Sequence, residues 1–416
     1  MPRDIRVMHF ADTHFGVELY GRLDPDTGLN TRLQDFKRSL TSAIESALER
    51  GIDLAVFAGD AYKSRDPRQT DQREFANCIR LLTQQNIPVV MLIGNHDMPA
   101  IRGRANAIEI YRTLGVTGVQ IVSRPEMFLV ETPAGKVRIV GIPYLLKGFS
   151  VAKEEYQGKT LEETRLLLEE KYSENIAHFA KQIRDANDDI PTILLGHFWA
   201  NGAKLSSWQE GYFSRDEAQV AVASLRDPAF DYVALGHIHK HQDLNKNGQP
   251  HIVYSGSPDK IDFGEKDEEK GYVYLNLRKG GADYQFVRTP ETRPLLDIDV
   301  DADCEEPTEK IVSAIQCHSL RNAIVKLSYR IGADRQSLVR EREIKDALAP
   351  AFMTVSIQRR IQRDSATRSL DFTEGKTPRE NLELYIEKTP NYQVRKERLL
   401  EMAEPLFAEL AEESAE

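Results

Sequence analysis

The residues best suited to chemistry in this sequence are aspartates, histidines and one asparagine that follow short apolar runs. Each run has the length of a buried strand and is bounded by a glycine or a tight turn. A parallel-type sheet brings the ends of its strands to one edge, which is where α/β proteins bind ligands. Singly, such residues are usually turn or core side chains, but their shared position predicts a site. The set is Asp12, His14, Asp60, Asn95, His197, His237 and His239.

The same set predicts a metal centre. Asp12 and His14 are two residues apart, as are His237 and His239, so each pair can point to one side of an extended turn. Carboxylate, imidazole and amide-oxygen ligands without a thiolate suit manganese or iron better than structural zinc. Seven ligands are too many for one ion. Two ions about 3.5–4 Å apart would share a carboxylate and hold a hydroxide in line with a phosphorus atom. We expect Asp60 to be that shared ligand.

The elements that would position these residues alternate between strands and helices. Strands are predicted at 5–10, 54–58, 89–93, 193–195 and 232–235, and helices at 33–50, 73–85 and 160–185. The last helix begins at a capping box formed by Thr160 and Glu163. This alternation predicts an α/β domain.

The sequence after Arg293 has a different pattern. Strands at 296–300, 323–329 and 354–357 enclose helices at 309–318 and 342–348, which predicts a small βαβαβ-like unit. A second capping box, Thr377 with Glu380, begins a helix, and apolar residues at helical spacing follow beyond Pro390. Two amphipathic helices can dock on their own domain or on another protein, and the sequence leaves both readings open.

Composition limits the class of protein. The chain has 416 residues, of which 41% are hydrophobic, and its 55 basic and 65 acidic residues give a net charge of −10. A freestanding basic coat protein is therefore excluded, and binding to DNA must depend on a local patch or a partner. Cys78, Cys304 and Cys317 include no CxxC pair, which suits a reducing compartment. Without a secretory leader or a long apolar stretch, we expect a cytoplasmic protein with no membrane contact.

Five short motifs follow one another in the first part of the chain. They are Asp12-x-His14, Gly59-Asp60, Gly94-Asn95-His96-Asp97, Gly196-His197 and Gly236-His237-x-His239. In type and order they resemble the motifs of the calcineurin-like metallophosphoesterases, and the likeness covers most of residues 5–264. The resemblance implies a four-layer α/β sandwich of two sheets flanked by helices, with two divalent metal ions.

The resemblance also assigns roles to individual residues. It places Asp12, His14, Asp60 and His239 at a first metal, and Asp60, Asn95, His197 and His237 at a second. By the same likeness, His96 is the catalytic histidine that contacts the phosphate and helps to protonate the leaving oxygen, while Asp97 orients its ring. One departure is the segment 61–64, where the family often has an aromatic residue and then an acid.

Further segments are similar to the SbcD-type nuclease subunits of bacterial double-strand-break repair complexes. They are Gly141-Ile142-Pro143-Tyr144, the run from Phe230 to Lys240, and Tyr254-Ser255-Gly256-Ser257-Pro258. This likeness implies a Mn²⁺-dependent nuclease domain at 1–290, a small α+β capping domain at 291–365, and C-terminal helices at 370–416. It also implies that those helices bind an SbcC-like ATPase with a long coiled coil. A homodimer is compatible with it.

Three functions follow from these observations. The first is a two-metal DNA nuclease, with exonuclease activity on duplex ends and endonuclease activity on single strands, acting in double-strand-break repair with the ATPase. The second keeps the chemistry but acts as a phosphodiesterase or phosphatase on a small molecule. The third is a DNA-tethering scaffold subunit. The complete ligand set argues against the scaffold, and the second accessory domain and the segment 254–258 argue against the small-molecule enzyme.

Overall fold

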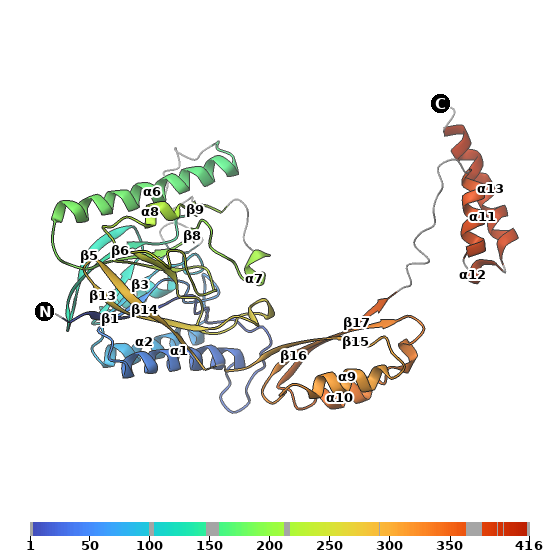
Figure 1. Ribbon diagram of the computed structural model, residues 1–416, viewed down its shortest axis with the longest axis horizontal. Helices are drawn as coiled ribbons and strands as arrows, with labels where there is room; N and C mark the ends of the chain where they lie inside the picture. Colours follow the sequence, from blue (N-terminus) through green and yellow to red (C-terminus); the bar gives the residue numbers. More distant parts are fainter. Residues whose placement is uncertain are drawn as a thin grey trace. The chain divides into compact units, whose positions relative to one another are not determined.

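The computed structural model describes residues 3–99, 104–146, 158–211, 217–290, 292–362, 377–388, 390–393 and 395–413 (Figure 1). The chain divides into two compact units. The first comprises Met1–Asp297, Arg321–Val325 and Ala351–Val355, and the second comprises Ile298–Leu320, Lys326–Pro350 and Ser356–Glu416.

The first unit contains two six-stranded sheets. One has the order β14-β13-β1-β2-β3-β4, and the other has the order β11-β12-β10-β7-β6-β5. The strands of the first sheet are β1 (Ile5–Phe10), β2 (Leu54–Phe57), β3 (Val89–Leu92), β4 (Val119–Val122), β13 (Gly271–Arg278) and β14 (Gly281–Arg288). Those of the second are β5 (Glu126–Thr132), β6 (Gly135–Ile142), β7 (Thr192–His197), β10 (Tyr232–Gly236), β11 (Gln242–Asp243) and β12 (His251–Tyr254).

Strands β1 to β4 are parallel neighbours, and so are β6, β7, β10 and β12. The ligand-bearing strands β1, β2 and β3 therefore end at the same edge of one sheet, and β7 and β10 end together in the other. This arrangement is the one that the sequence pattern predicts.

Alternating side chains place each sheet between two apolar layers. Val7 and Val56 share one core with Leu195 of the other sheet, whereas Phe10 and Phe57, on the opposite face, share another with the helical residue Phe36. The helices α1 (Thr31–Glu49) and α2 (Gln69–Gln84) cover that face, and α6 (Leu161–Ala186) covers the outer face of the second sheet (Figure 1). Two helices, the two sheets and α6 thus form four layers, which confirms the predicted four-layer α/β sandwich. The inner strands are covered on both faces, which explains their continuous apolar runs.

Helix boundaries agree closely with the capping signals. Thr160 caps α6 with the complete capping box, since its side chain accepts from the Glu163 amide and the Glu163 carboxylate accepts from the Thr160 amide. Helix α2 begins four residues earlier than predicted, at Gln69, directly after Arg68, whose side chain binds Asp71 of the first turn. The remaining short elements are η1 (Ala107–Glu109), α3 (Ile110–Thr113), β8 (Trp199–Ala200), α7 (Ser207–Glu210), β9 (Gln219–Val220), α8 (Val222–Leu225) and η2 (Phe263–Glu265).

The part of the chain after residue 294 has the predicted order of strand, helix, strand, helix and strand. The elements are β15 (Leu295–Asp301), α9 (Pro307–Gln316), β16 (Ile324–Gly332), η3 (Gln336–Leu338), α10 (Glu341–Leu348) and β17 (Met353–Gln362), and the sheet order is β15-β16-β17. Helices α11 (Pro378–Lys388), α12 (Pro390–Gln393) and α13 (Lys396–Glu413) follow. The predicted boundary between 365 and 370 lies outside the described residues. No helix among the described residues is long and apolar enough to cross a bilayer.

Candidate metal centre

The predicted ligands lie at or just after the carboxyl ends of five strands. Asp12 and His14 follow β1, Asp60 follows β2, and Asn95 follows β3. His197 is the last residue of β7, and β10 leads into the loop of His237 and His239. The donor atoms of the carboxylates and imidazoles form adjoining groups, and His96 belongs to one of them with His14 and Asp60. The structure therefore brings together all of these side chains, as expected from the strand-end pattern.

The backbone at this edge adopts conformations that L-residues rarely occupy. Asp12, His14, Asp60 and His237 have φ angles of 53°, 42°, 61° and 90°. Hydrogen bonds between loops hold this geometry, because Asp12 N donates to Gly59 O and Thr13 N donates to Asp60 O, each at 2.9 Å. Such strain persists only where the surroundings impose it, and it gathers at functional sites.

Two motif glycines are required by close approach of the ligands. A Cβ atom on Gly94 would lie 2.1 Å from Asp60 Oδ1, and one on Gly59 would lie 2.5 Å from His197 Nδ1. Any larger residue would displace the ligand beside it. The glycines that precede Asp60 and Asn95 therefore make room for the site itself.

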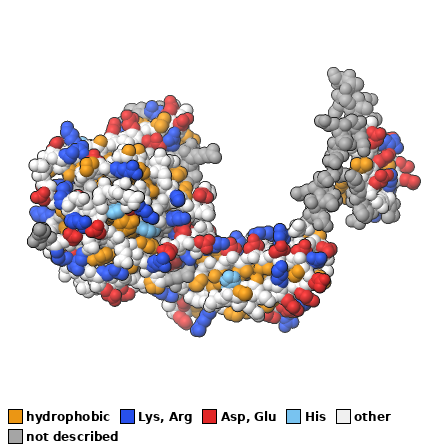
Figure 2. All heavy atoms as spheres, viewed as in Figure 1, with side chains coloured by type: hydrophobic (Ala, Val, Ile, Leu, Met, Phe, Trp, Pro, Cys, Tyr) orange, Lys and Arg blue, Asp and Glu red, His pale blue; other side chains and the backbone are white. Residues whose placement is uncertain are grey.

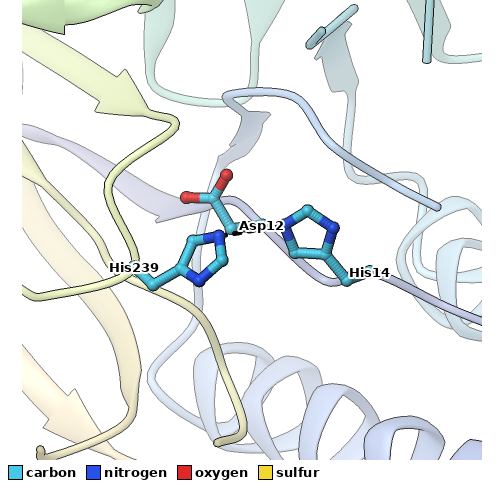
Figure 3. Close-up of side chains that lie close together, drawn as sticks. All are labelled: Asp12, His14 and His239. Carbon is cyan, nitrogen blue, oxygen red and sulfur yellow. Dashed lines mark hydrogen bonds between the residues drawn. The ribbon is translucent and has the colours of Figure 1, made fainter. Parts of the chain in front are cut away.

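The first group of donors is Asp12, His14 and His239, whose ligand atoms lie within 4.8 Å of one another (Figure 3). The Nε2 atoms of His14 and His239 are 3.0 Å apart. The Asp12 carboxylate is fully buried and accepts the His237 amide at 3.0 and 3.1 Å. This bond fixes the carboxylate against the loop that carries His239.

The second group is Asp60, His197 and His237, together with the amide oxygen of Asn95. Asn95 Oδ1 lies 3.0 Å from His197 Nε2 and 3.0 Å from His237 Nδ1. The opposite ring nitrogens are already bonded, His197 Nδ1 to Ala58 O at 2.6 Å and His237 Nε2 to Glu217 at 2.6 Å. Because a carbonyl and a carboxylate only accept, both rings are protonated on their outer nitrogens. In the neutral ring, the form that binds a metal, each inner nitrogen is then a lone-pair donor that faces another acceptor.

A bound cation would satisfy the lone pairs that converge here. His197 Nε2, His237 Nδ1 and Asn95 Oδ1 meet beside Asp60 Oδ2, which is 3.4 Å from His197 Nε2. Asp60 also attracts positive charge to this place: burial opposes protonation of His197, but Asp60 outweighs it and raises the pKa of His197 to about 9, so a proton and a metal ion would compete for Nε2. Nitrogen and oxygen donors without sulfur fit a divalent metal ion.

Asp60 lies between the two groups. Its Oδ2 atom is 3.7 Å from His14 Nε2 as well as 3.4 Å from His197 Nε2, and its Oδ1 atom accepts the His96 amide at 2.9 Å. Burial alone would raise the pKa of this carboxyl, but the surrounding histidines outweigh burial and hold it well below its usual range. Asp60 is therefore a carboxylate, the form that a metal requires.

The environment of Asp97 differs from the one we expected. Its carboxylate accepts the backbone amides of Asp60, Gly94 and Ala61 at 2.8–3.0 Å and does not orient the His96 ring. The ring of His96 is held instead by the carbonyl of Lys63, 2.7 Å from Nδ1. The carboxylate turns inward because three loop amides in the buried turn need an acceptor. Burial and the neighbouring Asp60 raise the pKa of Asp97 to about 7.

Three contacting residues were missed by sequence reasoning. Glu217 binds His237 Nε2, Glu265 binds His239 Nδ1 at 2.8 Å, and Gln209 bonds to the backbone of both histidines. Glu265 lies in a run of six charged residues, which is typical of a solvated turn. Burial opposes ionisation of Glu265, but Lys270 and His239 outweigh it and lower its pKa to about 2. No motif or spacing marks these residues in the sequence.

The donors open into a cavity of about 430 Å³. His96 lines it from one side, together with the exposed Lys63, while Val17, Leu19 and Ile261 supply apolar wall. A cavity of this size admits a phosphodiester with its flanking groups.

Comparison with known proteins agrees with this geometry. The family model described as calcineurin-like phosphoesterase matches residues 5–241. A DNA double-strand break repair protein Mre11 of Methanosarcina mazei is 27% identical over 84% of this chain and 48% of its own length. That of Thermoplasma acidophilum is 28% identical over 74% of this chain and 72% of its own length. The SbcD component of the nuclease SbcCD from Escherichia coli K12 is 26% identical over 70% of each chain.

The chain spans about half the length of the Methanosarcina protein that it matches. The family model, in contrast, covers more than half of this chain and includes every predicted ligand. The donor set is that of a divalent-metal centre. The chain belongs to the calcineurin-like phosphoesterase family.

Proposed function

We propose that this protein is a DNA nuclease that hydrolyses phosphodiester bonds with two Mn²⁺ ions. The observation that carries the proposal is the place of Asp60, whose Oδ2 atom lies between His14 of one donor group and His197 of the other. One carboxylate shared by two groups of donors is the arrangement of a two-metal hydrolase.

In this proposal the donors divide into two ligand sets. Asp12, His14, Asp60 and His239 hold one ion, and Asp60, Asn95, His197 and His237 hold the other. The bound ions would supply a hydroxide nucleophile and neutralise charge on the phosphoryl oxygens.

His96 is the proposed proton donor to the leaving oxygen. Its Nδ1 atom is committed to Lys63 O, so the proton that it transfers must be on Nε2, the nitrogen left for the cavity. Asp97 acts indirectly, because it binds the amides of both the Asp60 loop and the Gly94 turn and so fixes the distance between them. His96 would thus supply the proton, and Asp97 would hold the two loops beside it in place.

DNA is the proposed substrate, through exonuclease action on duplex ends and endonuclease action on single strands. The relatives named as Mre11 and as the SbcD component of SbcCD support this choice. Figure 2 shows Lys and Arg side chains interspersed with Asp and Glu on the face in view. Because the chain also has a net charge of −10, we propose that a partner supplies much of the cationic surface for DNA.

The accessory parts have proposed roles too. Residues 291–365 would cap the DNA-binding side, and the helices within 370–416 would bind a coiled-coil ATPase. Helices α11 and α13 contact each other, and Met402 and Leu406 of α13 are exposed, one turn apart. An apolar strip of this kind suits a helical partner.

The proposal is tested with the purified chain on linear duplex DNA, circular single-stranded DNA and a chromogenic phosphodiester, each with Mn²⁺ or with EDTA. We expect Mn²⁺-dependent cleavage of all three. Asp66→Ala is the control for Asp60→Ala, because Asp66 is an exposed carboxylate in the loop after Asp60. Hydrolysis of the small diester without any cleavage of DNA, even with the ATPase present, would favour the small-molecule phosphodiesterase.

A further inference from the structure

A buried ion pair lies directly behind one of the proposed ligands. Glu265 is fully buried and its Oε1 atom is 2.8 Å from His239 Nδ1. Its other oxygen, Oε2, lies 2.9 Å from Lys270 Nζ and accepts the Ile261 amide at 2.9 Å. Both carboxylate oxygens are thus occupied, and neither belongs to the proposed ligand set.

This contact determines which nitrogen of His239 carries the proton. A carboxylate paired with a lysine only accepts, so Nδ1 is protonated, and in the neutral imidazole Nε2 carries the lone pair. Nε2 is the atom that faces the site, 3.0 Å from His14 Nε2. In the other tautomer Nε2 would carry the proton, and His239 could not bind a metal through it.

We propose that Glu265 is a positioning residue that holds His239 with its Nε2 lone pair directed at the first metal. The inference rests on the proposed function, since it assumes that His239 is a ligand, and it adds a residue that acts through that ligand. Carboxylates that orient a ligating histidine in this way commonly contribute 10- to 100-fold to metal affinity.

Lys270 and Gln209 hold the same loop from its backbone. Lys270 Nζ donates to His239 O at 3.0 Å, and it also bonds Glu268 at 3.0 Å. Gln209 accepts the His239 amide at 3.1 Å. The ring and the backbone of His239 are therefore fixed separately. A change at Glu265 frees the ring while the backbone contacts remain, and Lys270 keeps Glu268 as a partner.

The chain offers a matched control in a second histidine–carboxylate pair. His251 Nδ1 lies 2.7 Å from Asp243 Oδ2, and the Asp243 side chain is fully buried, as that of Glu265 is. Neither residue lines the cavity of the metal centre. Asp243→Asn therefore removes an equivalent buried carboxylate beside an imidazole without touching a proposed ligand.

The test titrates Mn²⁺ into the full chain and follows free Mn²⁺ by electron paramagnetic resonance. We expect Glu265→Gln to lower the affinity for one of the two bound Mn²⁺ ions by roughly 10- to 100-fold. Asp243→Asn should leave the affinity for both ions unchanged. Folding of each variant is checked by circular dichroism. A folded Glu265→Gln protein that binds both ions with wild-type affinity would overturn the inference, whereas a wild-type chain that binds no Mn²⁺ would overturn the proposed function instead.

A second measurement needs no variant. Nitrogen-15 NMR of the histidine-labelled, metal-free wild-type chain distinguishes the two tautomers of each ring, and His239→Gln identifies the signals of His239. We expect His239 to be protonated on Nδ1. Protonation on Nε2 would contradict the positioning role even if Glu265→Gln fails to fold.

Discussion

Asp60 combines several demands in one side chain. It follows β2 with a positive φ of 61°, its Oδ1 atom accepts the His96 amide, and its Oδ2 atom faces both donor groups. The backbone strain at this position, of order 1–3 kcal/mol, is balanced by the contacts of the folded loops. We therefore expect no other side chain at this position to meet all of these demands.

We predict that Asp60→Ala abolishes metal-dependent hydrolysis of a chromogenic phosphodiester. Two cations would lose the carboxylate that screens them from each other. Turnover is compared at saturating Mn²⁺ with that of Asp66→Ala, which should equal wild type. Residual activity of Asp60→Ala within tenfold of wild type would rule out a shared ligand at this position.

His96→Ala should separate proton transfer from metal binding. We expect the variant to retain its Mn²⁺, because the His96 ring is tied to Lys63 O and is not among the proposed ligands. Turnover should fall by roughly 10² to 10⁴, the usual contribution of a general acid. Metal content by mass spectrometry and kcat are measured on the same sample. If the purified variant has lost its metal, His96 is a ligand and its proposed role is wrong.

The two sheets are joined by a polar contact within their shared core. His9 of β1 is fully buried; its Nε2 atom donates to Leu235 O of β10 at 3.2 Å, and its Nδ1 atom accepts from the Tyr232 hydroxyl at 3.1 Å. The ring is therefore neutral and its hydrogen-bonding groups are satisfied. Burial lowers the pKa of His9 to about 3.

This burial predicts a specific pH dependence of stability. Below about pH 6.5 the unfolded chain binds a proton on residue 9 that the folded chain does not, so the free energy of unfolding falls as the pH falls from about 6.5 to about 3. Between pH 6.5 and 5 the loss from His9 alone is about 2 kcal/mol. In urea unfolding, the free energy of unfolding of His9→Asn should change with pH less than that of wild type, by this amount. His318→Asn, which replaces an exposed histidine, is the control and should match wild type. Equal pH slopes for wild type and His9→Asn would contradict the prediction.

How far the sequence predicts these elements depends on which signals are local. Asp12, Asp60 and Asn95 could be placed at one edge because each directly follows a buried parallel strand. The hairpin of β13 and β14 was not predicted, although β13 completes the first sheet beside β1. Its strands carry no motif, and their pairing with β1 is a long-range contact.

The side chains around the ligands depend on the folded loops and not on local pattern. Asp97 is adjacent to His96 in sequence, so a contact between their side chains was a natural expectation, but the turn points them in different directions. Glu265 contacts His239 across 26 residues, and only the folded loop buries its carboxylate. Ligands at strand ends follow from local pattern, whereas the residues that support them depend on tertiary packing.

The first unit contains every proposed ligand, and the second contains α11 to α13. Ile386 of α11 is buried, whereas Met402 and Leu406 of α13 are 68% and 58% exposed. The helices therefore have an internal contact of their own and an additional apolar strip. The sequence could predict the helices but not which of their residues are exposed.

We predict that the double variant Met402→Glu/Leu406→Glu loses binding to the proposed coiled-coil ATPase while hydrolysis of a small phosphodiester stays at the wild-type rate. Two carboxylates on the strip would have to be desolvated on binding. Glu397→Gln on the same helix is the control and should bind normally. Co-purification of the double variant with the ATPase at wild-type affinity would place the partner surface elsewhere.

We propose that one buried carboxylate, that of Asp60, joins two metal sites. Anomalous diffraction from a crystal of the Mn²⁺-loaded chain is the test. We predict two peaks about 3.5–4 Å apart, one bound by Asp12, His14 and His239, the other by Asn95, His197 and His237, with Asp60 contacting both. A single peak, or two peaks that do not share Asp60, would contradict the claim.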